Sequence, residues 1–561
     1  MSFFSRKTRP ATSGRSPSRT FRPRLELLED RSVPSAGALD PTFGSGGIVT
    51  TKVSTNEDTA RAVALQTDGK VVVAGTAYLG AGYDSGAFAV LRYNANGSLD
   101  SSFGSGGKTI TDIDSRKADG ANAVAIDYSG GSLATNPNYG KIYAAGWASL
   151  GNPMFGAGAE DAAFALVRYN PNGTLDTTFG GSQAKGKVIT NFTSGSEYAY
   201  GVAVQPNGKI VVTGVGSDIV LARYNANGIL DGTFGNQGKV ITDDGIATDA
   251  AVGDMVLQAD GKIVVIGRGS VSGSGAYVSV LARYNGNGTR DNSFGTNGLV
   301  TTLDKRFGTV AVQPDGKLVA GGTNGVDESF HWAFARFETG GALDASFGTS
   351  GTVVTDTSGV ARAVTLDAAG RIVAAGWTPG VGTDTALLRL NPDGSLDATF
   401  GTGGKVQTSI SQFGDFASDV VIQTDGKIVT AGYFDSRATA GSPVDRDFAL
   451  ARYLPSSPQI GSFTASPNPL TAGSPVTLTA SNVQALNPGS TITQVAFYMD
   501  SNNNGVLDSG DSLLGYGTQT SPGTWTFTFT FATSGTYKLF ARAQDSYGVF
   551  SDPLALDLQV L

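Results

Sequence analysis

The segment from Asp500 to Asp511 combines residue types and a spacing that suit a calcium ion. Oxygen-bearing side chains stand at positions 1, 3, 5, 9 and 12 of this segment, and the carbonyl of Val506 would fill position 7. Alternate residues of such a loop converge on one hard cation, and Gly505 at position 6 permits the sharp turn. The sequence therefore predicts a Ca²⁺ site made by Asp500, Asn502, Asn504, Val506, Asp508 and Asp511.

Two features of this segment depart from the EF-hand calcium loop. Position 12 is Asp511 instead of the longer, bidentate glutamate, and the flanking residues have the pattern of strands instead of helices. Because only three of the ligands are carboxylates, we expect modest affinity for Ca²⁺. The alternative is a long polar hairpin that is held by turns between side chains and backbone.

A second set of residues could bind a ligand by stacking. Three aromatic residues, Trp147, Trp377 and Tyr433, follow the glycine of the same expected strand in three repeats, and His331 and Trp332 come from the corresponding loop of another. Aromatic rings on one face could stack on sugar rings or on a polymer. The alternative is that these residues cover the ends of strands as ordinary packing.

Catalytic chemistry has little support in the composition. The chain holds one histidine and no cysteine, which removes Cys–His nucleophiles and histidine-rich metal centres. His331 has no nucleophile-elbow sequence beside it. A carboxylate pair for glycoside hydrolysis leaves no local spacing signature, so this alternative stays open. We expect a protein that is not an enzyme.

A repeated element must position all these residues. A Phe-Gly pair ahead of a glycine-rich turn recurs at Phe43, Phe103, Phe179, Phe234, Phe294, Phe347 and Phe400. Such self-similarity is typical of a propeller, solenoid or array, in which each unit buries its apolar faces on its neighbours.

Each repeat contains four short apolar runs bounded by Gly, Asn or Asp, which are typical of strands. An Asp-Gly or Asn-Gly pair between the second and third runs favours a tight hairpin. Four strands in seven repeats predict an all-β fold, a seven-bladed β-propeller. Because residues 47–51 form a first strand and residues 448–453 a fourth, we expect each blade to hold one repeat. The ring would then close by packing of blade seven on blade one.

The expected fourth strand carries an arginine in every repeat: Arg92, Arg168, Arg223, Arg283, Arg336, Arg389 and Arg452. A ring of cations could bind a ligand, but a ligand site usually breaks the symmetry of repeats. We therefore expect each arginine to pair with an aspartate of a neighbouring turn. Chain direction places the Asp-Gly hairpins and Phe-Gly turns on one face of the ring. The connections on the other face vary in length, which is typical of binding loops.

Three recurrent phrases, Gln-x-Asp-Gly-Lys, Phe-Ala-Leu-x-Arg-Tyr-Asn and Leu-Asp-x-x-Phe-Gly, resemble the bacterial delta-60 repeat family over residues 39–453. The resemblance implies a propeller of this repeat length and no agreed activity. Residues 138–141, Asn-Tyr-Gly-Lys, depart from the usual hairpin.

Residues 456–561 lack the repeat phrases and follow a propeller domain that we place at residues 37–455. About seven short strands, with alternation at residues 526–531 and 537–542, predict an immunoglobulin-like β-sandwich without the disulfide. Residues 463–469, Phe-Thr-Ala-Ser-Pro-Asn-Pro, resemble the opening of bacterial Ig-like modules.

Residues 1–36 differ in charge from the rest of the chain. They carry eight Lys/Arg against three Asp/Glu, a net charge of +5, whereas the whole chain is at −8 and the remainder therefore at −13. An acidic body argues against nucleic-acid binding, and no segment has 18 consecutive apolar residues, so we expect no transmembrane span. Residues 22–34 resemble the Leu-Glu-Pro-Arg-type N-terminal region of exported bacterial proteins, which implies a leader. The alternative is a disordered tail.

These features predict a non-enzymatic, extracellular or cell-surface binding or scaffold protein, monomeric, whose partner is an extracellular polymer or protein. The propeller would present the binding face, and the Ig-like module would be a spacer or adhesion domain. The alternatives are a polysaccharide-active hydrolase or lyase, which needs a cleft with paired carboxylates, and a protein-docking scaffold, which needs apolar patches.

Overall fold

The computed structural model describes residues 36–561 except for residues 81–84, 114–117, 151–161, 193–194, 217, 243–246, 271–276, 304, 325–329, 381, 438, 440, 488–489, 509 and 547–548. The predicted leader region, residues 1–36, lies outside the described residues except for Ala36. The described chain is all-β, and α1 (Gly181–Ala184) is a single helical turn. None of the helices in the described part is long and apolar enough to cross a membrane.

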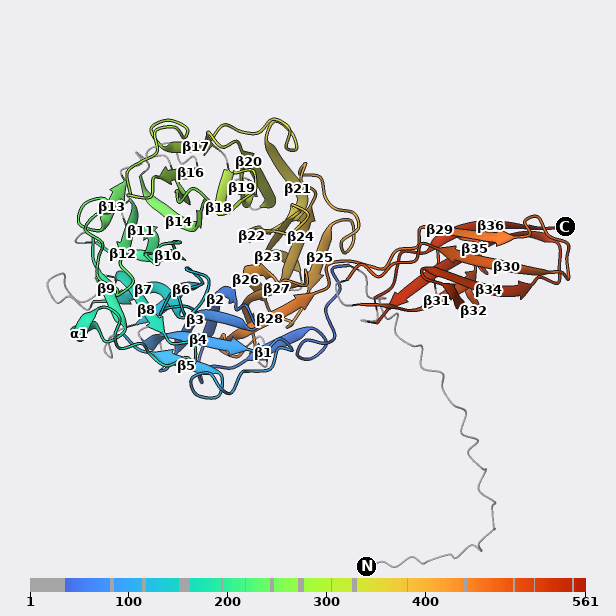
Figure 1. Ribbon diagram of the computed structural model, residues 1–561, viewed down its shortest axis with the longest axis horizontal. Helices are drawn as coiled ribbons and strands as arrows, with labels where there is room; N and C mark the ends of the chain where they lie inside the picture. Colours follow the sequence, from blue (N-terminus) through green and yellow to red (C-terminus); the bar gives the residue numbers. More distant parts are fainter. Residues whose placement is uncertain are drawn as a thin grey trace, which may run out of the picture. The chain divides into compact units, whose positions relative to one another are not determined.

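Seven four-stranded antiparallel sheets surround a common axis (Figure 1). In the order of hydrogen bonding, blade 1 holds β2 (Asp58–Leu65), β3 (Val71–Tyr78), β4 (Gly86–Tyr93) and β5 (Lys108–Thr111); blade 2 holds β6 (Asp119–Ile126), β7 (Ile142–Ser149), β8 (Ala162–Tyr169) and β9 (Lys187–Thr190); blade 3 holds β10 (Tyr198–Val204), β11 (Ile210–Val215), β12 (Ile219–Tyr224) and β13 (Lys239–Thr242); blade 4 holds β14 (Ala247–Leu257), β15 (Ile263–Ser270), β16 (Tyr277–Tyr284) and β17 (Leu299–Leu303).

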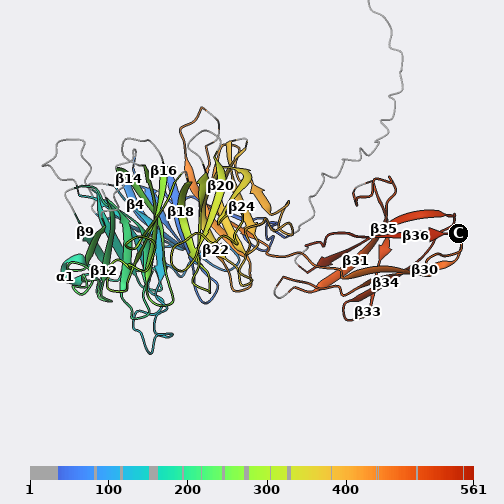
Figure 2. The same ribbon diagram turned by 90° about the horizontal axis from the view of Figure 1, so that it is seen from above.

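Blade 5 holds β18 (Lys305–Val312), β19 (Leu318–Asn324), β20 (His331–Phe337) and β21 (Thr352–Ser358); blade 6 holds β22 (Val360–Leu366), β23 (Ile372–Gly380), β24 (Gly382–Leu390) and β25 (Lys405–Thr408); blade 7 holds β26 (Asp415–Ile422), β27 (Ile428–Asp435), β28 (Arg446–Tyr453) and β1 (Ile48–Thr51). The prediction of an all-β chain with seven four-stranded blades is confirmed. The strands run between the two faces of the ring (Figure 2).

The predicted closure of the ring is wrong. Strand β1 pairs with β28, with Ile48 opposite Ala451 and Thr51 opposite Phe448, so the start of the chain completes blade 7 (Figure 1). Each blade therefore combines three strands of one repeat with the first strand of the next. The physical reason is that the Phe-Gly turn folds this short strand back onto the edge of the blade that precedes it, where its backbone groups find partners.

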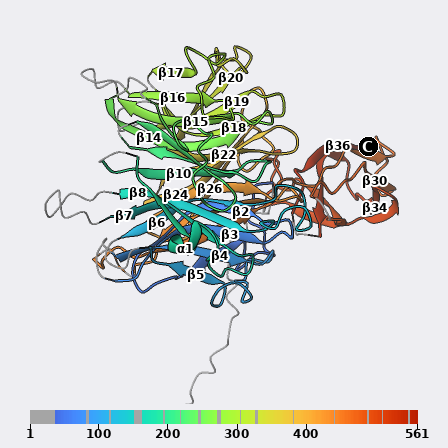
Figure 3. The ribbon, with the colours of Figure 1, turned by 60° about the vertical axis from the view of Figure 1, so that its left-hand side comes forward.

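The apolar core lies between the blades, which stack face to face (Figure 3). Seven clusters of buried side chains each join two neighbouring blades, including one between blades 7 and 1. Strands β4 and β8 are buried along their whole length. This explains why the central strands lack polar alternation, because both faces of each blade are covered.

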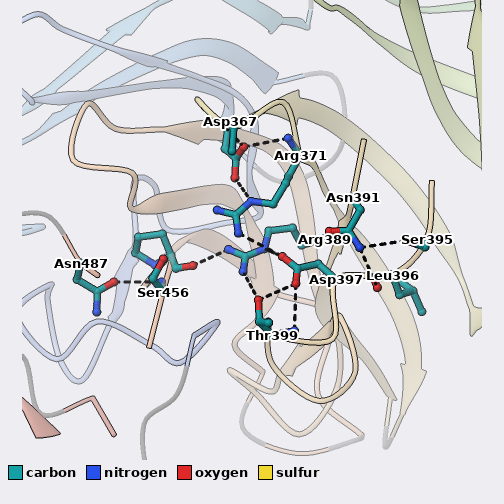
Figure 4. A network of polar contacts seen from close by, with 12 residues as sticks. Asp367, Arg371, Arg389, Asn391, Ser395, Leu396, Asp397, Thr399, Ser456 and Asn487 are labelled. Carbon is teal, nitrogen blue, oxygen red and sulfur yellow. Dashed lines mark hydrogen bonds and ion pairs between the residues drawn. The ribbon is translucent and has the colours of Figure 1, made fainter. Parts of the chain in front are cut away.

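The recurrent arginines pair with aspartates of the turns that follow their strands, as the sequence predicts. In each repeat the arginine Nε lies 2.7–2.9 Å from an aspartate Oδ2, and the guanidinium carbon lies 4.4–4.8 Å from the ring centroid of a Phe-Gly phenylalanine. Arg389 of blade 6 also donates to the carbonyl of Pro455, which follows β28 of blade 7, and Arg371 is a second cation on Asp397 (Figure 4).

The aspartates of these pairs stay ionised. Although burial acts to raise it, hydrogen bonds from Lys141 and Thr178 and the charge of Arg168 lower the pKa of Asp176 to about 2. Because a buried charge without its partner is costly, each pair is a structural link and leaves no free cation for a ligand.

A buried hydroxyl pair also recurs between blades. Five tyrosines at the ends of third strands bond to threonines of the preceding blade: Tyr93 to Thr51, Tyr169 to Thr111, Tyr224 to Thr190, Tyr284 to Thr242 and Tyr453 to Thr408. Blade 5 has Phe337 at this position, and among the described residues the Thr302 hydroxyl has no hydrogen-bond partner. The missing bond leaves a buried polar group unsatisfied.

Phe337→Tyr should raise the free energy of unfolding by about 1 kcal/mol, because a hydroxyl at this position would bond to Thr302. Equilibrium denaturation of the two proteins measures the change. The matched control, Tyr224→Phe, removes the equivalent bond to Thr190 and should lower stability by a similar amount. Destabilisation by Phe337→Tyr would mean that the packing has no room for the hydroxyl.

Residues 456–561 form two four-stranded antiparallel sheets around one core. One sheet has the order β29 (Ser462–Ser466), β30 (Pro475–Ser481), β34 (Thr524–Thr530) and β33 (Thr518–Ser521), and the other β32 (Ser512–Tyr516), β31 (Ile492–Met499), β35 (Gly535–Asp545) and β36 (Leu554–Val560). Val476 and Leu478 of the first sheet pack with Phe497 and Leu539 of the second, in a core that contains no propeller residue.

Candidate functional site in the propeller channel

The innermost strand of every blade contains a β-bulge at the same place. In β2, for example, the pairing with β3 shifts between Ala60 and Ala62, which leaves Arg61 unpaired. A bulge redirects the side chain of its extra residue. The seven bulge residues are Arg61, Asn122, Tyr200, Gly253, Gly308, Arg362 and Ser418. All seven line one cavity of about 290 Å³ inside the ring.

These positions break the symmetry of the propeller. Arginine, aspartate, phenylalanine and tyrosine recur at equivalent places in most blades, whereas the bulge position carries two arginines, two glycines, an asparagine, a tyrosine and a serine. Packing between blades gives no reason for such variety, because the bulge side chains face the channel. The channel is therefore the place in the propeller where individual side chains differ.

Three arginines, Arg61, Arg268 and Arg362, line this cavity. Arg61 and Arg362 are accessible to water in the channel, and Arg268 on β15 is half-buried. Burial and the charges of Arg362 and Arg306 lower the pKa of Arg268, and burial and the charge of Arg61 lower the pKa of Arg362. Within the described part of the chain, no acidic side chain forms an ion pair with any of the three.

Aromatic rings of blade 7 complete the wall. Phe416 stacks on Tyr433 at 5.0 Å between centroids, and the Arg61 guanidinium lies 5.9 Å from the Tyr433 ring. Phe416, Tyr433 and Tyr200 all line the cavity with the arginines. The cavity thus combines positive charge with flat apolar surfaces.

Two carboxylates line an adjoining cavity of about 240 Å³, which Arg61 and Arg362 also line. Asp254 on β14 accepts hydrogen bonds from the backbone N–H of Met255 (2.7 Å) and of Val310 in the next blade (3.1 Å). Asp419 on β26 accepts from Val420 and from Val63 in blade 1, both at 2.8 Å. Burial raises the pKa of Asp254 to about 6 and that of Asp419 to about 7, although these amide hydrogen bonds act to lower both.

The structure brings together only some of the residues that the sequence predicts for a ligand face. Tyr433 lines the channel, and Trp377 packs edge-on against Phe416 at 6.2 Å. Trp147 packs against Tyr198 of the next blade at 5.8 Å.

Two further residues of that predicted face lie at the start of β20. His331 is half-buried. The prediction that Trp332 belongs to a ligand face is wrong. Its side chain has no exposed surface, and its indole N–H donates to the Trp377 carbonyl. It is part of the core between blades 5 and 6 and cannot stack on a ligand.

The predicted calcium loop is held by its own backbone amides. Asp500 accepts from the N–H groups of Asn504 and Gly505, and Asp511 accepts from those of Ser501 and Asp508. The Asp508 carboxylate accepts from the Asn502 amide. Among the described residues, no group of three or more acidic or histidine side chains is placed to hold a metal.

The side chain of Asn504 also follows the turn pattern. The Asn504 side chain accepts from the N–H of Val506 at 2.9 Å, so oxygens that would face a cation face amides. This arrangement is that of the polar hairpin alternative, and a cation would have to replace several of these hydrogen bonds.

The sequence analysis did not predict the channel arginines as site residues. Arg61 and Arg362 stand between alanines, in Ala-Arg-Ala at residues 60–62 and 361–363, where another repeat has Ala-Asn-Ala at 121–123. A charged residue inside an otherwise apolar strand was the available signal. This signal identifies an unusual position in the strand, but it does not show that these residues meet across the ring.

Three solved structures are similar to parts of this chain: virginiamycin B lyase from Staphylococcus aureus (11% identity, TM-score 0.36, 72% of this chain and 98% of that chain), Drosophila Semaphorin 2a (9%, 0.39, 94% and 99%) and an alpha-L-arabinofuranosidase from Fusarium graminearum (9%, 0.37, 75% and 97%). These likenesses carry no argument about activity. No curated protein matches the sequence.

A family model described as a domain of unknown function (DUF5122) beta-propeller matches seven segments of the chain, at residues 66–103, 140–179, 205–234, 258–294, 313–347, 370–400 and 423–457. Each segment extends from a hairpin region to the Phe-Gly turn or its equivalent position. The sequence repeats, the propeller sheets and the family matches each number seven. The chain therefore carries seven DUF5122 β-propeller repeats.

Proposed function

We propose that this chain is a non-enzymatic binding protein of the cell surface or extracellular space, and that its propeller binds a ligand in the central channel. The observation that supports this most is the loss of sevenfold symmetry at the seven bulge positions, which all line one cavity. Ligand sites commonly lie in concave places where a few polar groups converge on an apolar wall. Arg61, Arg362 and Tyr433 supply such groups.

A polysaccharide hydrolase or lyase is the second candidate, because the channel contains two carboxylates with raised pKa values. In a glycosidase one carboxyl must reach the leaving oxygen and the other the sugar or a water. Here both oxygens of Asp254 and both oxygens of Asp419 accept hydrogen bonds from the wall. This geometry supports a structural role for the pair and a binding role for the channel.

The other parts of the proposal concern the ends of the chain. The two sheets of residues 456–561, with their single core, support an Ig-like module that acts as a spacer or adhesion domain. The basic N-terminal region, by its resemblance, would direct export, and the repeat phrases would place the propeller among delta-60 repeat proteins. The partner would be an extracellular polymer or protein or a component of one, bound by a monomer.

Ser418→Trp should abolish ligand binding, because Ser418 lines the cavity and an indole would fill much of its volume. Binding of the full-length protein to arrays of glycans and small organic ligands measures the effect. Ala345→Trp adds the same bulk at an exposed position of a Phe-Gly turn and should leave binding unchanged. Ligands that bind both variants equally well would place the binding site outside the channel.

If the loop from Asp500 to Asp511 binds Ca²⁺, calcium should raise the melting temperature of residues 456–561 within the full-length protein. A ligand at 100 times its Kd stabilises the folded state by about 2.7 kcal/mol. Asp500→Ala should remove the response, whereas Ser501→Ala, at a position that points away from the ion, should keep it. Equal melting temperatures in calcium and in chelator would show that the loop is a polar hairpin that does not bind Ca²⁺.

A further inference from the structure

We infer that the channel ligand is a small molecule with at least two anionic groups, which Arg61, Arg268 and Arg362 bind together. This inference rests on the proposed function and specifies its ligand. Carboxylate, phosphate and sulfate groups share the chemistry that a guanidinium recognises, because its planar fork donates two parallel hydrogen bonds to two oxygens.

The three arginines come from different parts of the ring. Arg61 belongs to blade 1, Arg268 to blade 4 and Arg362 to blade 6. All three nevertheless line one cavity, and the charge of Arg362 reaches both Arg61 and Arg268. One carboxylate has two oxygens and accepts the bidentate fork of only one guanidinium. A ligand with two or more anionic groups can engage more than one.

The charge of the protein makes this cluster unusual. Residues 37–561 carry a net charge of −13, so acidic partners are abundant in the chain. The recurrent arginines of the blades each have such a partner, whereas the three channel arginines form no ion pair among the described residues. The two carboxylates that line the adjoining cavity accept hydrogen bonds from backbone N–H groups instead. Like charges in a confined space repel each other and disfavour the charged form. A bound polyanion would remove this cost.

The size of the cavity limits the ligand. About 290 Å³ lies at the lower end of the range for ligand sites, which suits a small polyanion or one charged terminal unit. Tyr200, Phe416 and Tyr433 add flat surfaces that would contact the carbon skeleton between the anionic groups. A rival explanation, that the arginines only hold the blades apart, predicts no dependence on the charge of a ligand.

Calorimetric titration of the full-length protein tests the inference with three probes: citrate as a polycarboxylate, pyrophosphate as a phosphoryl compound, and acetate as a singly charged control. Citrate or pyrophosphate should bind at least about tenfold more tightly than acetate, and added sodium chloride should weaken binding. Preference for citrate or for pyrophosphate distinguishes the two sources of negative charge. Failure of both to bind, or equal binding of acetate, overturns the inference.

Variants show where the anion binds. Arg362→Gln and Arg61→Gln should each reduce the affinity for the bound probe about tenfold or more, and Arg362→Lys should retain part of it because the charge remains. Arg290→Gln removes an exposed arginine of a Phe-Gly turn and should change nothing. Unchanged melting temperatures establish that the variants fold. Equal losses in Arg290→Gln and Arg362→Gln would mean that the anion responds to overall charge only, which overturns the site.

The two proposals fail in different ways. If a neutral ligand binds wild type but not Ser418→Trp, while citrate and pyrophosphate do not bind, the channel function stands and the polyanion inference is wrong. If citrate or pyrophosphate binds Ser418→Trp as tightly as wild type, the anion lies elsewhere and both proposals are wrong.

Discussion

Deletion of residues 36–51 should leave no stable ring. It removes β1 from the edge of blade 7 and Phe43 from the cluster between blades 7 and 1. It also removes Asp40, which has no exposed surface and pairs with Arg452 at 2.9 Å. Loss of a partner from a buried ion pair costs about 3–5 kcal/mol, and loss of a buried phenylalanine costs a similar amount. We therefore expect a loss of more than about 5 kcal/mol.

Asp40→Ala is the milder form of this test, should the truncated chain fail to fold. It leaves β1 in place but removes the carboxylate that both Arg452 and Lys427 contact, so we expect a loss of about 3–5 kcal/mol in denaturant titration. Asp315→Ala, at an exposed hairpin position, is the control and should cost about 1 kcal/mol at most. A truncated protein as stable as wild type would show that β1 does not close the ring.

The folded protein should lose stability as the pH rises from about 4 to about 7. The pKa of Asp254 is raised to about 6 and that of Asp419 to about 7, with burial as the main cause. At pH values between the ordinary pKa near 4 and these raised pKa values, both carboxyl groups keep their protons in the folded protein and lose them in the unfolded chain. Unfolding then releases protons, so higher pH favours it. Allowing for water in the channel, we expect a decrease on the order of 3 kcal/mol.

Burial also raises the pKa of Asp58 and of Asp415, which adds to this slope, whereas the aspartates that pair with the recurrent arginines do not produce it. The pKa of Asp291 is lowered to about 2, because hydrogen bonds from Ser293 and the charge of Arg283 outweigh burial, so the stability that it contributes is lost only in stronger acid. Urea titrations at several pH values measure the slope. The double variant Asp254→Asn, Asp419→Asn should reduce this slope. An unchanged slope in this variant, or stability that rises with pH over this range, would contradict the assignment.

Local patterns in the sequence predicted a large part of the fold correctly. The Asp-Gly hairpins, the short β-branched runs and the Phe-Gly turns depend on contacts within one repeat, so their number and order could be counted. The pairing of Arg389 with Asp397 was accessible in the same way, because the two residues are only 8 positions apart and both recur along the chain.

The site could not be derived in this way, because its members are far apart in the chain. Arg61 and Arg362 meet only because seven innermost strands surround one axis, and their bulges turn equivalent side chains inwards. The edge that β1 joins and the burial of Trp332 likewise depend on which blade lies next. The sequence by itself determined the repeating unit, since each unit is specified by local hydrogen bonding. Only the tertiary structure decided the contents of the channel, because closure of the ring alone sets the distances between different repeats.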